Sequence, residues 1–190
     1  MKIPLYIIIA IGTVLLTLDL SSYTKKLPSV PKQESILKIH KKNTNLTIGW
    51  IAPTAWQKTK KSSMRLGSYD VKAVFDSGET EITDLSIIKL RGDGGGNFDN
   101  LNRWRSQVDL PAIKQSDFAK HIINLHGKLG DFIVVKIINT KNPSLAMLGA
   151  MIPASGNMIY VKLTGSSMAV NKLTHEFKAF AKTIHFIGEE

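Results

Sequence analysis

The stretch DFIVVKIINTKNPSLAMLGAMIPASGNMIYVKLTG, residues 131–165, decides the fold class of this chain. It holds three apolar segments rich in residues that favour strands: DFIVVKIIN, LAMLGAMIP and MIYVKLTG. Their connections, TKNPS and ASGN, are short and contain the residues that favour tight turns. Tight turns join neighbouring strands that run antiparallel. The stretch therefore predicts three antiparallel strands lying side by side.

Four more segments outside this stretch are also predicted to be strands. KHIINLHG, residues 120–127, precedes it with a short turn between. Nearer the N-terminus, strands are expected near Thr44–Ile51, Arg65–Phe75 and Glu81–Leu90, because β-branched residues alternate there between turn residues. We expect these three to form a meander. Seven strands with hairpin connections predict a largely antiparallel sheet.

Two helices are predicted to pack on this sheet. In SSMAVNKLTHEFKAFAKTIHF, residues 166–186, apolar residues recur at helical spacing, and Ser166 or Ser167 is expected to be the N-cap. The second helix is expected over residues 97–108, where Leu101, Trp104 and Val108 continue a stripe that begins at Phe98. The expected class is α+β: a largely antiparallel sheet of about seven strands with two helices packed on it, in one domain over residues 44–187.

The N-terminal segment is predicted to be a signal peptide or a membrane anchor over residues 1–24. An uncharged run from Ile3 to Leu18 follows a single lysine, as in the apolar core of such segments. The following LDLSSY lacks the small residues of a good cleavage site, which favours an uncleaved anchor.

The net charge of +10 is concentrated in one part of the chain. Residues 25–61 contain nine lysines and one glutamate, whereas residues 62–190 contain fifteen basic and thirteen acidic side chains. A nearly neutral domain disfavours nucleic-acid binding. Residues 25–43 are predicted to be a basic juxtamembrane linker, either solvated or lying on anionic lipid.

The membrane side of the domain stays open on these observations. The lysines that follow the apolar run favour a cytoplasmic domain by the positive-inside rule, whereas a signal-like run favours export. We favour a chain anchored to the cell membrane whose domain is periplasmic or otherwise extracytoplasmic.

A glycine cluster precedes the predicted helix in RGDGGGNFDNLNRWRSQVDLP, residues 91–111. The glycines at 92, 94, 95 and 96 permit a tight turn before Asn97 or Asp99 caps the helix. The pattern G-x-G-G-G-N lacks the third glycine of G-x-G-x-x-G and the G-K-[ST] ending of a P-loop, which disfavours nucleotide binding by those routes. An anion held by the helix N-terminus remains open.

The helix carries an unusual number of polar side chains. Arg105 lies within the apolar stripe, so it either locks the helix to a loop or contacts a ligand, and we favour locking. Arg103 is expected to face outward and to pair with Asp99, four residues earlier. The candidate binding residues are Gly94, Gly95, Gly96, Asn97, Asn100, Asn102, Arg103, Trp104, Arg105 and Gln107, with Trp50 and Trp56 as further candidates.

Enzymatic chemistry is disfavoured, although one arrangement stays open. The chain has no cysteine, no H-E-x-x-H and no G-x-S-x-G, and the five-residue step from His121 to His126 puts them on opposite faces of a strand. No catalytic residue, metal or cofactor is therefore predicted. The alternative is a hydrolase-like enzyme centred on Asp93, Asp99 and Arg105.

The N-x-N-R-W-R-x-Q motif formed by residues 100–107 resembles one found in an uncharacterised family of small bacterial envelope proteins. The likeness extends over roughly residues 48–187 and includes G-W-x-x-P-x-x-W at residues 49–56, Met64–Arg65 and MIYVKLTG. It implies an envelope location and a domain similar in outline to the PsbP-like sandwich, although this chain lacks the lipoprotein cysteine of some members. We therefore expect a non-catalytic binding domain of the cell envelope, whose partner is an unknown envelope protein or a small ligand.

Overall fold

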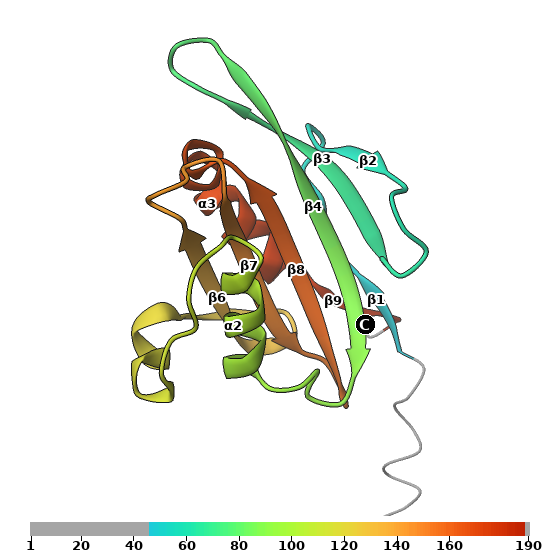
Figure 1. Ribbon diagram of the computed structural model, residues 1–190. Coiled ribbons are helices and arrows are strands. Elements are labelled where there is room, and N and C mark those ends of the chain that lie inside the picture. Colours follow the sequence, from blue (N-terminus) through green and yellow to red (C-terminus); the bar gives the residue numbers. More distant parts are fainter. Residues whose placement is uncertain (1–45, 189–190) are drawn as a thin grey trace, which may run out of the picture. The chain divides into compact units, whose positions relative to one another are not determined.

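The computed structural model describes residues 46–188, which form two antiparallel sheets and three helical segments (Figure 1). The main sheet has seven strands in the order β2 (Gln57–Thr59), β3 (Gly67–Val74), β4 (Thr80–Arg91), β8 (Asn157–Gly165), β7 (Ala146–Pro153), β6 (Gly130–Ile138) and β5 (Ile123–Gly127). Every neighbouring pair in it runs antiparallel. The α+β class and the seven-stranded antiparallel sheet are confirmed.

One predicted strand belongs to a different sheet. The segment expected near Thr44–Ile51 contains β1 (Thr47–Gly49), which pairs with β9 (His185–Ile187) in a separate two-stranded sheet. The expected three-stranded meander is therefore wrong, and the seventh strand of the main sheet is β2. The β2 sequence QKT is three residues long and polar, so it has no alternation that could have revealed it.

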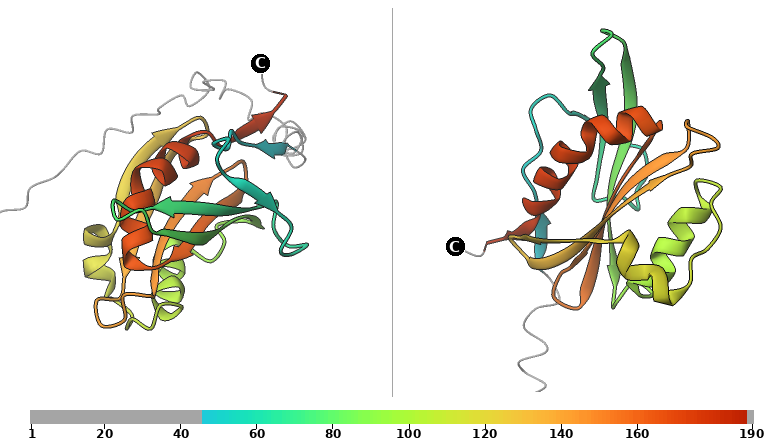
Figure 2. Two further views of the ribbon diagram at one scale, coloured as in Figure 1. Left: turned by 90° about the horizontal axis from the view of Figure 1, so that it is seen from above. Right: turned by 90° about the vertical axis from the view of Figure 1, so that its left-hand side faces the viewer.

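The main sheet lies between helices on both of its faces (Figure 2, right). Helix α3 (Ser167–Lys182) covers one face, whereas α2 (Asn97–Ser106) and the 3-10 helix η2 (Gln115–His121) lie on the other. Because β7 lies under helices on both faces, it is buried from Ala146 to Ile152 and shows no polar alternation.

Each face of the sheet has its own core. On the α3 side, Phe177 and Phe180 of the helix pack with Leu85, Ile87 and Leu148 of the strands. The predicted N-cap of this helix is confirmed at Ser166, whose side chain accepts a hydrogen bond from the Ala169 N–H at 3.1 Å.

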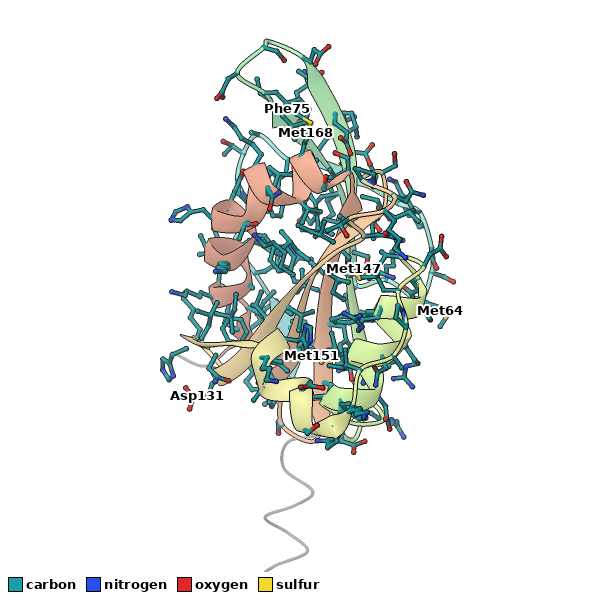
Figure 3. All side chains as sticks on the ribbon, turned by 60° about the vertical axis from the view of Figure 1, so that its left-hand side comes forward. Met64, Phe75, Asp131, Met147, Met151 and Met168 are labelled. Atoms are coloured by element: carbon teal, nitrogen blue, oxygen red, sulfur yellow. The ribbon has the colours of Figure 1, made fainter. Side chains whose placement is uncertain are left out.

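The α2-side core contains Leu101 and Trp104 of α2, together with Val108. Val108 lies beyond the helix, which ends at Ser106 and not at the expected residue 108. Figure 3 shows Met147 and Met151 in this layer, between the sheet and its α2-side helices. Phe98, the first residue of the stripe, is half-buried and meets Phe118 of η2 edge to face, with ring centroids 6.0 Å apart. The α2-side layer therefore includes η2 as well as α2.

The predicted anchor, residues 1–24, and the predicted basic linker, residues 25–43, lie outside the described residues. Within residues 46–188, no helix has the length and apolar character needed to cross a membrane.

Candidate functional site

A hollow of about 190 Å³ opens beside α2 on the sheet face opposite α3. Three parts of the chain form it: the segment before β3, strands β4 and β8, and one side chain of α2. Figure 3 shows Met64 next to α2, at the rim. The lining residues are Ser62, Met64, Arg65, Ser86, Ile88, Trp104, Tyr160 and Lys162.

The pairing of β4 with β8 places the residues that form the floor of the hollow next to one another. Ser86 pairs with Lys162, and Ile88 pairs with Tyr160, so that four side chains from β4 and β8 stand on one face. The residues between them, such as Ile87 and Val161, face the α3-side core. Because α2 has only ten residues, this part of the sheet stays partly uncovered.

Trp104 forms one wall of the hollow, and its ring packs on β7 at a glycine, Gly149. A Cβ atom placed on Gly149 of β7 would lie 2.0 Å from Cζ3 of Trp104, so the ring rests on the strand backbone. Trp104 also meets Tyr160 edge to face, with ring centroids 5.8 Å apart. The ring therefore has a defined position, and Trp104 as a whole is only 7% exposed.

The glycine loop is held by Asn100 and Tyr160. The buried Nδ2 of Asn100 lies 3.0 Å from the Gly94 carbonyl, 2.7 Å from the Gly96 carbonyl and 2.8 Å from the Tyr160 hydroxyl. The backbone φ of Gly94, Gly95 and Gly96 is positive, at 63°, 87° and 77°, as expected for a turn that only glycine makes readily. Two of the candidate binding features, the glycine loop and Asn100, are thus hydrogen-bonded to each other.

Two expectations about this helix are wrong. Gly96, rather than Asn97 or Asp99, occupies the N-cap position, and no side chain caps it. Arg103 turns back to the Gly94 carbonyl, at 3.1 Å, and to Oδ1 of Asn100, instead of pairing with Asp99. For Arg103, the loop carbonyl attracts the guanidinium, which helical spacing alone cannot anticipate.

The C-terminal half of α2 is tied to the chain that follows it. Arg105 Nε donates to the Pro111 carbonyl at 2.8 Å, which agrees with the locking role favoured from the sequence. Asn102 Oδ1 accepts a hydrogen bond from the Ile113 N–H at 2.9 Å. Of the candidate binding residues, Trp104 lines the hollow, and Gln107 reaches it through Lys162.

The charged groups near the hollow form a short network. Arg65 donates to both carboxylate oxygens of Asp84, at 2.9 Å each, and Lys61 lies 2.6 Å from Asp70 and 3.2 Å from Asp84. Lys162, from β8, donates to Oε1 of Gln107 at 2.9 Å. Burial lowers the pKa of Lys162, Arg65 lowers it further, and Asp84 partly opposes both effects.

The contribution of Asp84 to the stability of the fold depends on pH. Burial alone would raise the pKa of Asp84, but hydrogen bonds from Arg65 and Lys61 outweigh it and bring the pKa below the ordinary 3.8. A lowered folded-state pKa stabilises the fold above the unfolded-state pKa, and this contribution is lost as pH falls through the folded value.

We expect Asp84→Asn to destabilise the protein at neutral pH but much less in acid. Urea unfolding of both proteins at about pH 7 and about pH 3 measures this, and the gap between them should narrow at the lower pH. An equal gap at both values would contradict the assignment.

The tryptophans proposed as additional binding residues lie elsewhere. Trp56 is buried in the α3-side core, where its indole donates to Oε1 of Glu176 at 2.6 Å. Trp50 packs against the same core and donates to the Tyr69 hydroxyl at 2.8 Å. They cannot share a surface with α2, because the sheet separates them from it.

The residues of the hydrolase alternative do not form a common group. Asp93 accepts a hydrogen bond from the Gly95 N–H at 2.9 Å within the loop that precedes α2, whereas Arg105 contacts Pro111 beyond the other end of the helix. Asp99 is exposed. Among residues 46–188, no group of three His, Asp or Glu side chains is arranged to hold a metal ion.

The floor residues Ser86, Ile88, Tyr160 and Lys162 were not among the sequence-predicted site residues. One signal was available, because Lys162 interrupts an otherwise apolar strand in MIYVKLTG. Its neighbours on β4, however, depend on a pairing between residues about 75 positions apart, such as Ser86 with Lys162.

Comparisons with known proteins report likeness to solved structures only. No protein-family model and no curated protein sequence match the chain. The solution structure of cyanobacterial PsbP from Synechocystis sp. PCC 6803 has a TM-score of 0.44 and 12% identity, over 73% of this chain and 86% of that one. The crystal structure of LpqN, involved in cell envelope biogenesis of Mycobacterium tuberculosis, has a TM-score of 0.40 and 13% identity, over 75% and 84%. The family resemblance through N-x-N-R-W-R-x-Q stays a prediction.

Proposed function

We propose that this chain is a membrane-attached or exported envelope protein whose domain binds a small ligand, without catalysis, in the hollow beside α2. The observation that carries the binding role is the composition of the hollow. Trp104 in the wall and Ile88 in the floor give the hollow apolar surface, and the floor also contains a half-buried lysine, Lys162, whose hydrogen-bond partner is a neutral amide. Concave sites with apolar walls and a few converging polar groups are typical of ligand binding.

The candidate residues of the glycine loop and α2 support this role indirectly. Asn100 is hydrogen-bonded to the glycine loop, and Arg105 is hydrogen-bonded to the segment that follows α2. Gly149 leaves room for the Trp104 ring to pack on β7. Because α2 is held at both ends, Trp104 keeps the same position before and after binding. This lowers the entropic cost of binding.

A tryptophan in place of Ile88 is expected to abolish binding by filling the hollow. Ligand-observed NMR with a library of small acids, amides and amines, applied to the full chain in nonionic detergent, should detect binders that are lost in Ile88→Trp. The matched control is Ile82→Trp, on the same face of the same strand, where the side chain is 57% exposed and outside the hollow. Binders that both variants retain would show that the hollow is not the site.

The envelope location rests on the apolar run Ile3–Leu18, whereas the lysines that follow it oppose an exported domain. Protease treatment of intact and then permeabilised cells tests it. Digestion of the domain once the outer barrier is opened supports the periplasmic location. Protection until the inner membrane is broken would place the domain in the cytoplasm, as the positive-inside rule suggests.

A further inference from the structure

The charges around the hollow do not balance. Three cations, Lys61, Arg65 and Lys162, lie near two carboxylates, Asp70 and Asp84. Lys61 already contacts both carboxylates, at 2.6 and 3.2 Å, and Arg65 contacts Asp84 at 2.9 Å. Within residues 46–188, no carboxylate lies within ion-pair distance of Lys162. One positive charge therefore remains at the floor of the hollow.

The positive charge of Lys162 is poorly stabilised in the free protein. Lys162 is half-buried, close enough to Arg65 to be repelled by it, and its hydrogen bond goes to the uncharged Gln107. An ammonium removed from water gains most from a negatively charged partner. A bound monoanion would neutralise the surplus.

Trp104 lines the same hollow as Lys162, and its indole carries a further hydrogen-bond donor. The indole N–H groups of Trp50 and Trp56 donate to Tyr69 and Glu176, whereas within the described chain that of Trp104 donates to no protein group. An ammonium and an indole N–H together suit a carboxylate.

The size of the hollow limits what can enter. At about 190 Å³ it is smaller than the roughly 300 Å³ at which sites for drug-sized molecules begin, so it holds a compact ligand or one end of a longer one. Ile88 and the Trp104 ring offer apolar contact. At the rim, the 80% exposed Met64 has a flexible side chain that can fold over a ligand.

We propose that the hollow binds a small monoanionic carboxylate, with the carboxylate on Lys162 and the apolar part of the ligand against Trp104 and Ile88. This inference rests on the proposed binding function and names its ligand class.

Three probes that share one ring test this assignment: benzoate, benzamide and phenyl phosphate. Their dissociation constants are measured by NMR titration of the full chain in nonionic detergent. We expect benzoate to bind at least about tenfold more tightly than benzamide, because a charged hydrogen bond to Lys162 is gained. Phenyl phosphate, with a larger and more highly charged group, should bind more weakly than benzoate.

Lys162→Met should remove the preference for benzoate and weaken its binding about tenfold. Lys136→Met is the matched control, because Lys136 also donates to an amide oxygen, that of Asn171 at 3.1 Å, but toward α3. It should bind benzoate like the wild type. The thermal midpoint of Lys162→Met should not fall, because the substitution removes a poorly solvated charge.

Other outcomes separate the two proposals. Equal binding of benzoate and benzamide, or full benzoate binding by Lys162→Met, would overturn the carboxylate assignment. If Ile88→Trp still abolishes benzamide binding in that case, the hollow stands as a site for neutral ligands. Tighter binding of phenyl phosphate than of benzoate would replace the carboxylate with a phosphate. If no probe responds to Ile88→Trp, the binding role of the hollow fails as well.

Discussion

Gly149→Ala is expected to lower the free energy of unfolding by about 3 kcal/mol, at the upper end for an overpacked core. The added methyl group would lie 2.0 Å from Cζ3 and 2.5 Å from Cε3 of Trp104, which is well inside van der Waals contact. The strand backbone is held by β6 and β8 on both sides, so it cannot move away, and the ring must be displaced. Urea unfolding followed by circular dichroism measures the loss.

A double-mutant cycle shows whether Trp104 is the cause. In a Trp104→Leu background the space above Gly149 is larger, so Gly149→Ala should cost less than about 1 kcal/mol. The two substitutions should therefore be strongly non-additive. An additive result would mean that the alanine clashes with something other than the ring. The ring is also a wall of the hollow, so Gly149→Ala should weaken ligand binding.

Asn100→Ala is expected to cost about 2 to 3 kcal/mol, because it removes the buried amide that joins the glycine loop to Tyr160 of β8. Its Nδ2 serves the Gly94 and Gly96 carbonyls and the Tyr160 hydroxyl, and its Oδ1 accepts from Arg103. Asn100 is 4% exposed, so water cannot readily replace these contacts. Equilibrium urea unfolding of the full chain provides the measurement.

Asn97→Ala is the control for this substitution. Asn97 is the first residue of the same helix and is only half-buried, and its side chain makes no hydrogen bond within residues 46–188. Its replacement should change the free energy of unfolding by about 0.5 kcal/mol or less. Equal losses at both positions would show that the amide network of Asn100 contributes little.

The hydrogen bonds of α2 indicate that most of its polar side chains have a structural role. The amides and arginines of residues 100–107 suggested a surface that binds a partner, but most of their polar atoms contact the loops on either side of α2. Replacing Arg103 and Arg105 together would loosen both loops. A loss of binding in that variant would therefore not distinguish a direct contact from a structural one, whereas Ile88→Trp and Lys162→Met act at the hollow itself.

The sequence by itself determined the class of the fold and most of its elements. Strands β3 to β8 and helix α3 follow from patterns within short segments: alternating apolar residues, turn residues between them, and Ser166 before an amphipathic run. The positive φ angles of the glycine loop and the locking role of Arg105 were also readable, because each depends on neighbours a few residues away.

Only the tertiary structure decided where the hollow lies and which side chains meet there. Lys162, Ser86 and Arg65 come together through the pairing of β4 with β8 and through a segment before β3, none of which leaves a local pattern. The same reason explains why Trp50 and Trp56 were misplaced and why β1 was assigned to the wrong sheet. Local periodicity reports which face of an element is apolar, whereas the identity of the facing element depends on contacts between residues far apart in the chain.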